Sequence, residues 1–158
     1  MISVILIPGD SAVLARTLAA LVPAAVDGLV KTVIVVPAQT DRAVLALVED
    51  SGARLVSASG DRGARLAAGA AVASGDWILT LDPALDLPED WRGPVEAHLA
   101  GGGGSPAWFG PPGLVDRLTG RALGVLVRRA DYTAGGGFAP GDRPEKALIR
   151  ALRARRIG

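Results

Sequence analysis

The sequence predicts an α/β fold in which a mostly parallel sheet is covered by helices. Short runs of β-branched residues alternate with longer stretches in which apolar residues recur at helical spacing, the pattern of repeated β-α-β units. The first run, residues 2–7, is apolar apart from Ser3, as a strand buried on both faces should be. A chain of 158 residues suits one compact domain.

The first half of the chain alternates predicted strands and helices without interruption. Strands are expected at residues 2–7, 31–36, 53–58 and 76–81, and the helices between them at residues 13–21, 40–51 and 62–74. Asp10 and Ser11 can cap the first helix, and Thr40 or Asp41 can cap the second. Gly52 follows the second helix and favours its termination there.

The second half of the chain is less regular. The expected elements are a helix over residues 88–100, an irregular loop over 101–113, one more strand within 120–132, a glycine-rich turn over 133–142 and a final helix over 143–156. Leu148 and Leu152 fall on one face of that final helix, which makes it amphipathic. The second half of the chain is therefore expected to be short and rich in loops.

Composition excludes several classes of protein. The formal net charge is +1, so no overall charge attracts nucleic acid or an anionic membrane. Cysteine is absent, which excludes disulfides, thiolate zinc sites and a cysteine nucleophile. No window approaches the roughly 18 apolar residues of a membrane span, and the N-terminus has no basic leader. These features predict a soluble cytoplasmic protein.

Two aspartates follow the fourth predicted strand, in the segment GDWILTLDPALDLPEDW of residues 75–91. Asp82 stands where that strand ends, and open parallel sheets bind ligands outside the carboxyl ends of their strands. Asp82 is therefore a candidate site residue, although an aspartate here can also cap the next turn. Asp86 has the same two interpretations, with a solvated turn favoured.

The order of these segments resembles the family 2-like glycosyltransferases of GT-A fold, in particular their small bacterial members. The resemblance covers nearly the whole chain and rests on the segments ISVILIP, TLAALVPA, VIVVP, GARLVSA, RGARLAAGAAVASGDWILTLD, LPEDW and VLVRRADYTAGGGFAP. It implies one GT-A-like domain over residues 1–158. Residues 1–92 would be its nucleotide-binding half, and residues 93–158 its acceptor-side half.

That resemblance implies transfer of a sugar from a nucleotide-diphosphate donor, such as a UDP-sugar, to the hydroxyl of an unidentified acceptor. The developing charge on the departing diphosphate must be neutralised, which Mg²⁺ or Mn²⁺ can do when held by hard oxygen ligands. An acidic residue near the acceptor would take the proton of the attacking hydroxyl as a general base.

The resemblance places the metal ligands and the base on this sequence with several departures. The family's Asp-x-Asp metal motif falls on Asp82 and Ala84, so only its first carboxylate is present. Asp86 would serve as a second ligand only if the loop folds back. The family's Glu-Asp pair before the last helix aligns with Pro144 and Glu145, which leaves Glu145 as the candidate base.

The nucleotide site departs from the family as well. Pro37 stands where the family has an aspartate that binds the base, and proline offers neither a side-chain acceptor nor a backbone donor. Asp41 is a substitute from the shortened loop that follows. Arg62 matches a basic position before the third helix and would meet a phosphate. Pro8 and Asp10, after the first strand, complete the expected nucleotide-binding set.

These departures support a competing hypothesis, a catalytically silent GT-A domain that binds a sugar or a partner protein through the same cleft. The two hypotheses differ in whether Asp82, Asp86 and Glu145 converge on one cleft. A third possibility, a nucleotidyltransferase, would need a glycine-rich loop with a nearby lysine after the first strand. The segment PGDSAVLAR provides no such loop.

The remaining notable residues are assigned mainly structural roles. His98 is expected at the surface. Trp77, Trp91 and Trp108 are expected as core or loop anchors, and Trp108 is the best candidate among them to stack on a sugar. A cluster of C-terminal arginines is expected to form a solvated helix face, with pairing to lipid phosphates or an acidic partner as the alternative. The cluster consists of Arg150, Arg153, Arg155 and Arg156.

Overall fold

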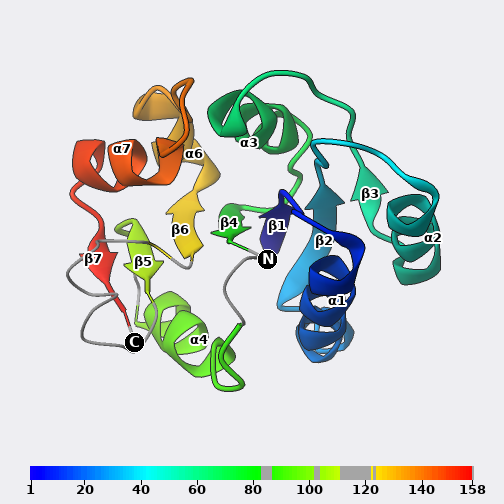
Figure 1. Cartoon of the computed structure of the whole chain (residues 1–158). Helices are drawn as coiled ribbons and strands as arrows, with labels where there is room; N and C mark the ends of the chain where they lie inside the picture. Colours follow the sequence, from blue (N-terminus) through cyan, green and yellow to red (C-terminus); the bar gives the residue numbers. More distant parts are fainter. Residues whose placement is uncertain (83–86, 102–103, 111–121, 123, 158) are drawn as a thin grey trace.

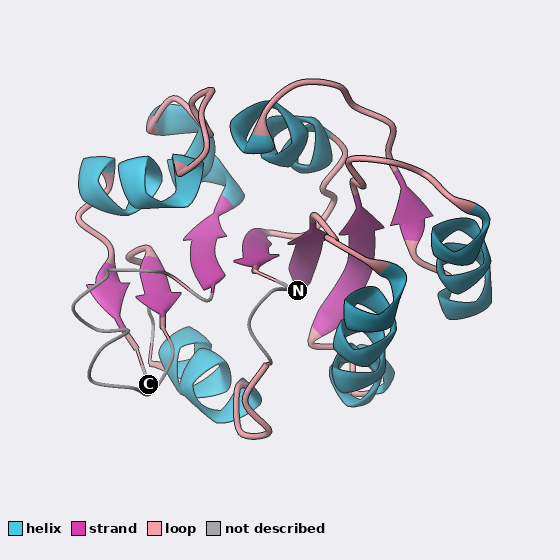
Figure 2. Cartoon of the chain, in the orientation of Figure 1, coloured by secondary structure: helices cyan, strands magenta, loops and turns pink. Residues whose placement is uncertain are grey.

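The computed structural model describes residues 1–82, 87–101, 104–110, 122 and 124–157. One sheet crosses the molecule, with α1, α2 and α4 on one face and α3, α6 and α7 on the other (Figures 1 and 2). This arrangement confirms the predicted α/β class with a mostly parallel sheet flanked by helices.

The sheet has seven strands in the order β3-β2-β1-β4-β6-β5-β7. They are β1 Ile2–Leu6, β2 Val30–Val35, β3 Arg54–Leu55, β4 Trp77–Leu81, β5 Ala107–Phe109, β6 Gly124–Arg128 and β7 Arg155–Arg156. Pairing is parallel from β3 through β4, and β6 is antiparallel to both of its neighbours, β4 and β5. The carboxyl ends of β1 to β4 therefore share one edge of the sheet, which we call the carboxyl edge; the opposite edge is the amino edge.

The first helices begin at aspartate caps, as side-chain acceptors at a helix start should allow. The helices are α1 Ser11–Val26, α2 Arg42–Ser51, α3 Arg62–Ala71, α4 Arg92–Ala100, α6 Arg129–Ala134 and α7 Pro144–Ala151. The side chains of Asp10, Asp41 and Asp61 accept hydrogen bonds from the third residue after each of them, at the starts of α1, α2 and α3. Asp41, rather than Thr40, is thus the cap of α2, and Gly52 ends it in a left-handed conformation at φ 68°.

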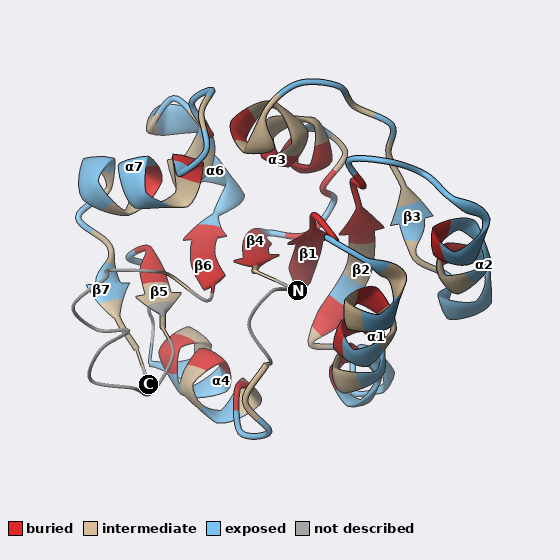
Figure 3. Ribbon diagram, in the orientation of Figure 1, coloured by how far each residue is buried: buried red, intermediate tan, exposed pale blue. Residues whose placement is uncertain are grey.

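Alternate residues of the buried strands fill two hydrophobic clusters, one on each face of the sheet (Figure 3). Leu6 of β1 points to the cluster under α1, α2 and α4, whereas Ile5 points to the cluster under α3 and α7. Trp77 and Trp91 are 7% and 4% exposed, so both belong to the core, one of the two places expected for them.

Helix α3 lies across β1 and runs from the carboxyl edge to the amino edge. An added Cβ on Gly69, near the end of α3, would lie 2.7 Å from Cγ2 of Ile5, so the helix touches the strand. An added Cβ on Gly75, which follows the helix, would lie 2.8 Å from the backbone of Met1 and of Ser3 at the amino end of β1. The start of α3, with Arg62, therefore lies toward the carboxyl edge.

The second half of the chain departs from expectation in three places. Part of the loop predicted at 101–113 forms β5, because Ala107–Phe109 pairs with β6. The strand expected within 120–132 is shorter, and its last part is helix α6. The final helix ends at Ala151, after which Arg153 adopts a positive φ of 50° and redirects the chain into β7 beside β5.

His98 was assigned wrongly to the surface, and the expected helix face of arginines is wrong for Arg155, which is exposed but lies on β7. His98 is 2% exposed, and its Nε2 donates to the Ser105 carbonyl at 2.9 Å. Its Nδ1 lies 2.9 Å from Nη2 of Arg155 and accepts from it, because that guanidinium can only donate. Arg155 belongs to β7 and not to a helix, so this contact joins α4 to β7. Among the described helices, none is long and apolar enough to cross a membrane.

Candidate functional site

Asp82 and Pro8 both lie at the carboxyl edge, because β1 and β4 are neighbours and end there together. Leu6 pairs with Leu81 in the register of these two strands, so the residues that follow each strand leave the sheet together. Asp82 is partly buried, and Pro8 is buried. Asp86, the second expected metal ligand, lies outside the described residues, so its prediction is untested.

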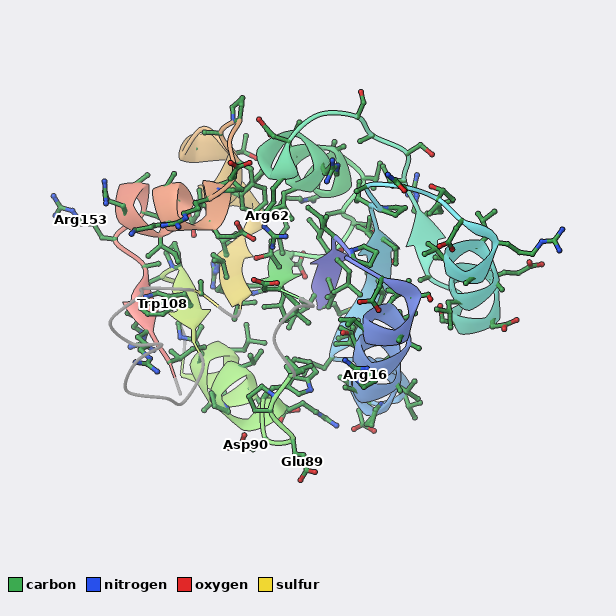
Figure 4. All side chains as sticks on the ribbon, viewed as in Figure 1. Arg16, Arg62, Glu89, Asp90, Trp108 and Arg153 are labelled. Carbon is green, nitrogen blue, oxygen red and sulfur yellow. The ribbon has the colours of Figure 1, made fainter. Side chains whose placement is uncertain are left out.

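Arg62 and Glu145 form a mostly buried ion pair between the starts of α3 and α7. The Nε and Nη2 atoms of Arg62 both donate to Oε1 of Glu145, at 2.9 and 2.5 Å. The two side chains are 22% and 13% exposed. Figure 4 shows Arg62 directed toward the middle of the molecule, between α3 and α7. The structure thus joins two residues that sequence reasoning assigned to different partners, a phosphate and an acceptor hydroxyl.

The backbone around this ion pair is held by Asp61 and Gly141. One carboxylate oxygen of Asp61 caps α3 through the Ala64 N–H at 2.9 Å, and the other accepts from the Gly141 N–H at 2.8 Å. The Gly63 N–H in turn donates to the Gly141 carbonyl at 3.0 Å. Gly141 has φ 131°, a conformation that favours glycine. The segment that leads to Glu145 is therefore fastened to the start of α3.

Asp10 and Asp41, two of the expected nucleotide ligands, are exposed and serve as helix caps. Each carboxylate accepts a backbone hydrogen bond at 2.8 Å, from Val13 and Val44 respectively. Capping occupies one oxygen of each carboxylate. Pro37 is buried at the end of β2, the position where the resembled family has its base-binding aspartate.

Comparison with solved structures identifies the fold. No protein-family model matches the chain, and no curated protein matches it. Similar structures include glucosyl-3-phosphoglycerate synthase from Mycobacterium tuberculosis without ligands, with a TM-score of 0.79 and 23% identity over 99% of this chain and 70% of the synthase. The same synthase with Mn²⁺, UDP-glucose and phosphoglyceric acid gives 0.79 and 22% over 99% and 68%. This chain has a GT-A-like fold.

The GT-A-like fold places the candidate residues on its carboxyl edge, but they do not form a preassembled metal centre in the part of the chain described here. No group of three or more His, Asp or Glu side chains converges among those residues. Asp82 supplies a single carboxylate, whose hard oxygens are of the kind that Mg²⁺ and Mn²⁺ prefer. A cation at this edge would therefore depend on further oxygens from its ligand and from water.

Trp108, the candidate for sugar stacking, lies on β5 of the GT-A-like sheet. The guanidinium of Arg156 lies over its ring, 5.5 Å from the centroid, and the indole packs beside the α3–α7 cluster. A ring face covered by a cation is not open to a sugar, so the geometry favours a structural role for Trp108.

Sequence reasoning missed the contribution of Gly63 and Gly141 to this site. An added Cβ on Gly63 would collide with the backbone carbonyl of Ala139, so only glycine permits the close approach of the two segments. The available signal was the glycine directly after Arg62, at a helix start where glycine is otherwise unfavourable. Its partner is more than seventy residues away in the sequence, so no local pattern reveals the contact.

Proposed function

We propose that this chain is a glycosyltransferase of the family 2-like type, which transfers a sugar from a nucleotide-diphosphate donor to an acceptor hydroxyl. The observation that carries the proposal is the likeness, over 99% of the chain, to a synthase solved with Mn²⁺ and UDP-glucose. The ion pair of Arg62 and Glu145 supports it, because the candidate phosphate ligand and the candidate base are neighbours.

In this proposal, Arg62 and Asp82 bind the donor diphosphate. The guanidinium of Arg62 is planar and can form two parallel hydrogen bonds to phosphate oxygens. Asp82 would hold Mg²⁺ or Mn²⁺ together with diphosphate oxygens and water. The bound cation would stabilise the charge that develops on the leaving diphosphate. Pro8, Asp10 and Asp41 would line the nucleoside side of the same edge.

Glu145 would act as the general base. Its carboxylate would take the proton of the acceptor hydroxyl while the hydroxyl oxygen forms a bond to the anomeric carbon of the sugar. The bond between that carbon and the diphosphate breaks, and its electron pair leaves with the diphosphate. With proline at position 37, recognition of the nucleotide base would rest on fewer polar groups than in the resembled family.

A binding titration with two aspartate variants tests this function. We expect UDP to raise the melting temperature of the chain in the presence of Mn²⁺. The same titration with GDP shows whether the identity of the nucleotide base affects binding. Asp82→Asn should abolish the effect of Mn²⁺. Asp76→Asn is the matched control, because Asp76 precedes the same strand at the amino edge and its side chain is 82% exposed. No binding by the unmodified chain at millimolar UDP or GDP would contradict the proposal and favour a silent binding domain.

A further inference from the structure

We propose that the Arg62–Glu145 ion pair masks the base until the donor is bound. The inference rests on the proposed function and adds an order of events to it: the diphosphate takes over Arg62, and only then is the Oε1 oxygen of Glu145 able to accept a proton. Without a donor, the acceptor hydroxyl would meet a carboxylate that is already engaged.

The geometry of the ion pair supplies the first reason. Both hydrogen bonds from Arg62 go to the same oxygen of Glu145, and both side chains are mostly buried. A carboxylate oxygen that accepts two charge-assisted hydrogen bonds holds its electron density toward the cation. That oxygen cannot take a proton from a hydroxyl without first losing a contact to Arg62.

The position of Arg62 supplies the second reason. Helix α3 runs along β1 and starts at the carboxyl edge, where Asp82 ends the neighbouring strand β4. A diphosphate bound at this edge brings several acceptor oxygens and more negative charge than one carboxylate. It therefore competes with Glu145 for the same guanidinium.

The fixed backbone supplies the third reason. Asp61 and Gly63 hold Gly141 through two hydrogen bonds that do not involve the ion pair. The segment before α7 can thus stay in place while the ion pair opens. Release of Glu145 then needs a rotation of its side chain and no movement of the backbone segment that carries it.

A double-mutant cycle measured by calorimetry with UDP and Mg²⁺ tests the competition. Glu145→Gln keeps the shape of the side chain and removes its charge, so we expect UDP to bind about threefold to tenfold more tightly. Arg62→Met should weaken binding by about tenfold or more. In the Arg62→Met background, Glu145→Gln should have no further effect, because the competition acts through Arg62.

The matched control is Glu96→Gln. Glu96 pairs with Arg92 at 2.8 Å on α4, and Arg92 also reaches Asp27 at the end of α1, near the amino edge. Loss of the same charge there should leave UDP affinity unchanged. Tighter binding in Glu96→Gln would mean that net charge alone is responsible, and it would overturn the inference.

A second readout follows the unmodified chain and needs one folded variant, Arg62→Met, for assignment only. The Nε–H resonance of Arg62, assigned by its absence in Arg62→Met, should shift when UDP and Mg²⁺ are added. Binding of UDP without that shift, or tightening by Glu145→Gln that persists in Arg62→Met, would overturn the inference and leave the proposed function intact. No binding of UDP by any form would overturn both.

Discussion

At the amino edge of the sheet a side chain fastens stretches of backbone together, whereas at the carboxyl edge the main long-range contact joins two side chains. The buried hydroxyl of Ser3 accepts hydrogen bonds from the N–H groups of Ser74 and Gly75, at 3.2 and 2.8 Å. Arg62 and Glu145, in contrast, join two helices by opposite charges. A ligand can exchange a charged side-chain pair, but it cannot replace a backbone bond without unfolding the segment. The Arg62–Glu145 pair is therefore suited to respond to a ligand, whereas the Ser3 contact is not.

The largest expected effect comes from Gly63→Ala at the carboxyl edge. The added methyl group would meet the carbonyl of Ala139, so the segment before α7 must shift, at a cost of about 3 kcal/mol in the free energy of unfolding. Under the proposed function, binding of UDP should weaken as well. Urea denaturation and calorimetry would measure the two effects.

Gly75→Ala is the matched change at the amino edge. Its Cβ would lie 2.8 Å from the Met1 carbonyl oxygen and from the Ser3 nitrogen, so a similar loss of stability is expected. At temperatures where the variant is folded, its affinity for UDP should be unchanged. Equal losses of UDP affinity in the two variants would mean that the edges do not differ in function.

His98→Ala should lower the free energy of unfolding by about 2 kcal/mol. The imidazole is buried and bonded at both nitrogens, to the Ser105 carbonyl and to Arg155, and its ring packs edge-on to Trp77 with centroids 6.0 Å apart. Truncation leaves a cavity and unsatisfied polar groups. A melting temperature within one or two degrees of the unmodified chain would contradict this structural role. Affinity for UDP should not change.

Ser3→Ala should cost about 1 kcal/mol. It leaves the N–H groups of Ser74 and Gly75 without the hydroxyl that accepts from them, while removing very little volume. Hydrogen exchange at these two amides should accelerate while exchange at Gly141 stays unchanged. Faster exchange at all three amides would show that the two edges are not independent.

The smallest effect concerns Tyr132 of α6 at alkaline pH. Burial raises the pKa of its hydroxyl, and the hydrogen bond from the Phe138 N–H opposes that rise. The folded chain thus holds the proton more tightly than the unfolded chain, so stability is full below pH 10 or so and falls as the pH rises toward the folded pKa. Tyr132→Phe should reduce this fall, seen by urea denaturation at about pH 8 and about pH 10.5. An identical fall in both proteins would contradict the assignment.

The first half of the fold could be predicted closely because its signals are local. The apolar run at residues 2–7 contains β1, Ile2–Leu6. Helix α2 begins after Asp41 and ends before Gly52, as expected for a capping aspartate and a terminating glycine. The second half depends on pairings between distant segments. Residues 155 and 156 have a helical sequence pattern but form β7, because Arg153 turns the chain toward β5. Residues 107–109 form β5 within a predicted loop, because they pair with β6.

The candidate site was predictable by residue type but not by contact. Asp82 lies at the carboxyl edge, as the end of a predicted strand required. Arg62 and Glu145 were assigned separately, and no periodicity links residues 83 positions apart. His98 was misplaced because a lone polar residue in a helix usually faces solvent, and its buried partners come from other segments.

The position of β6 has a consequence for synthesis of the chain. All five residues of β4 are buried, and its second edge is covered by β6, which begins only at Gly124. While the residues between β4 and β6 are being translated, β4 has no partner on its second side. We therefore expect a nascent chain that has formed β1 to β4 to expose an unpaired apolar strand, which is prone to aggregation and is a target of chaperones. Proteolysis of ribosome-stalled chains should cut within residues 77–81 before β6 emerges and not afterwards. Speed of elongation through the glycine-rich middle of the sequence would then influence the yield of folded protein as much as its final stability.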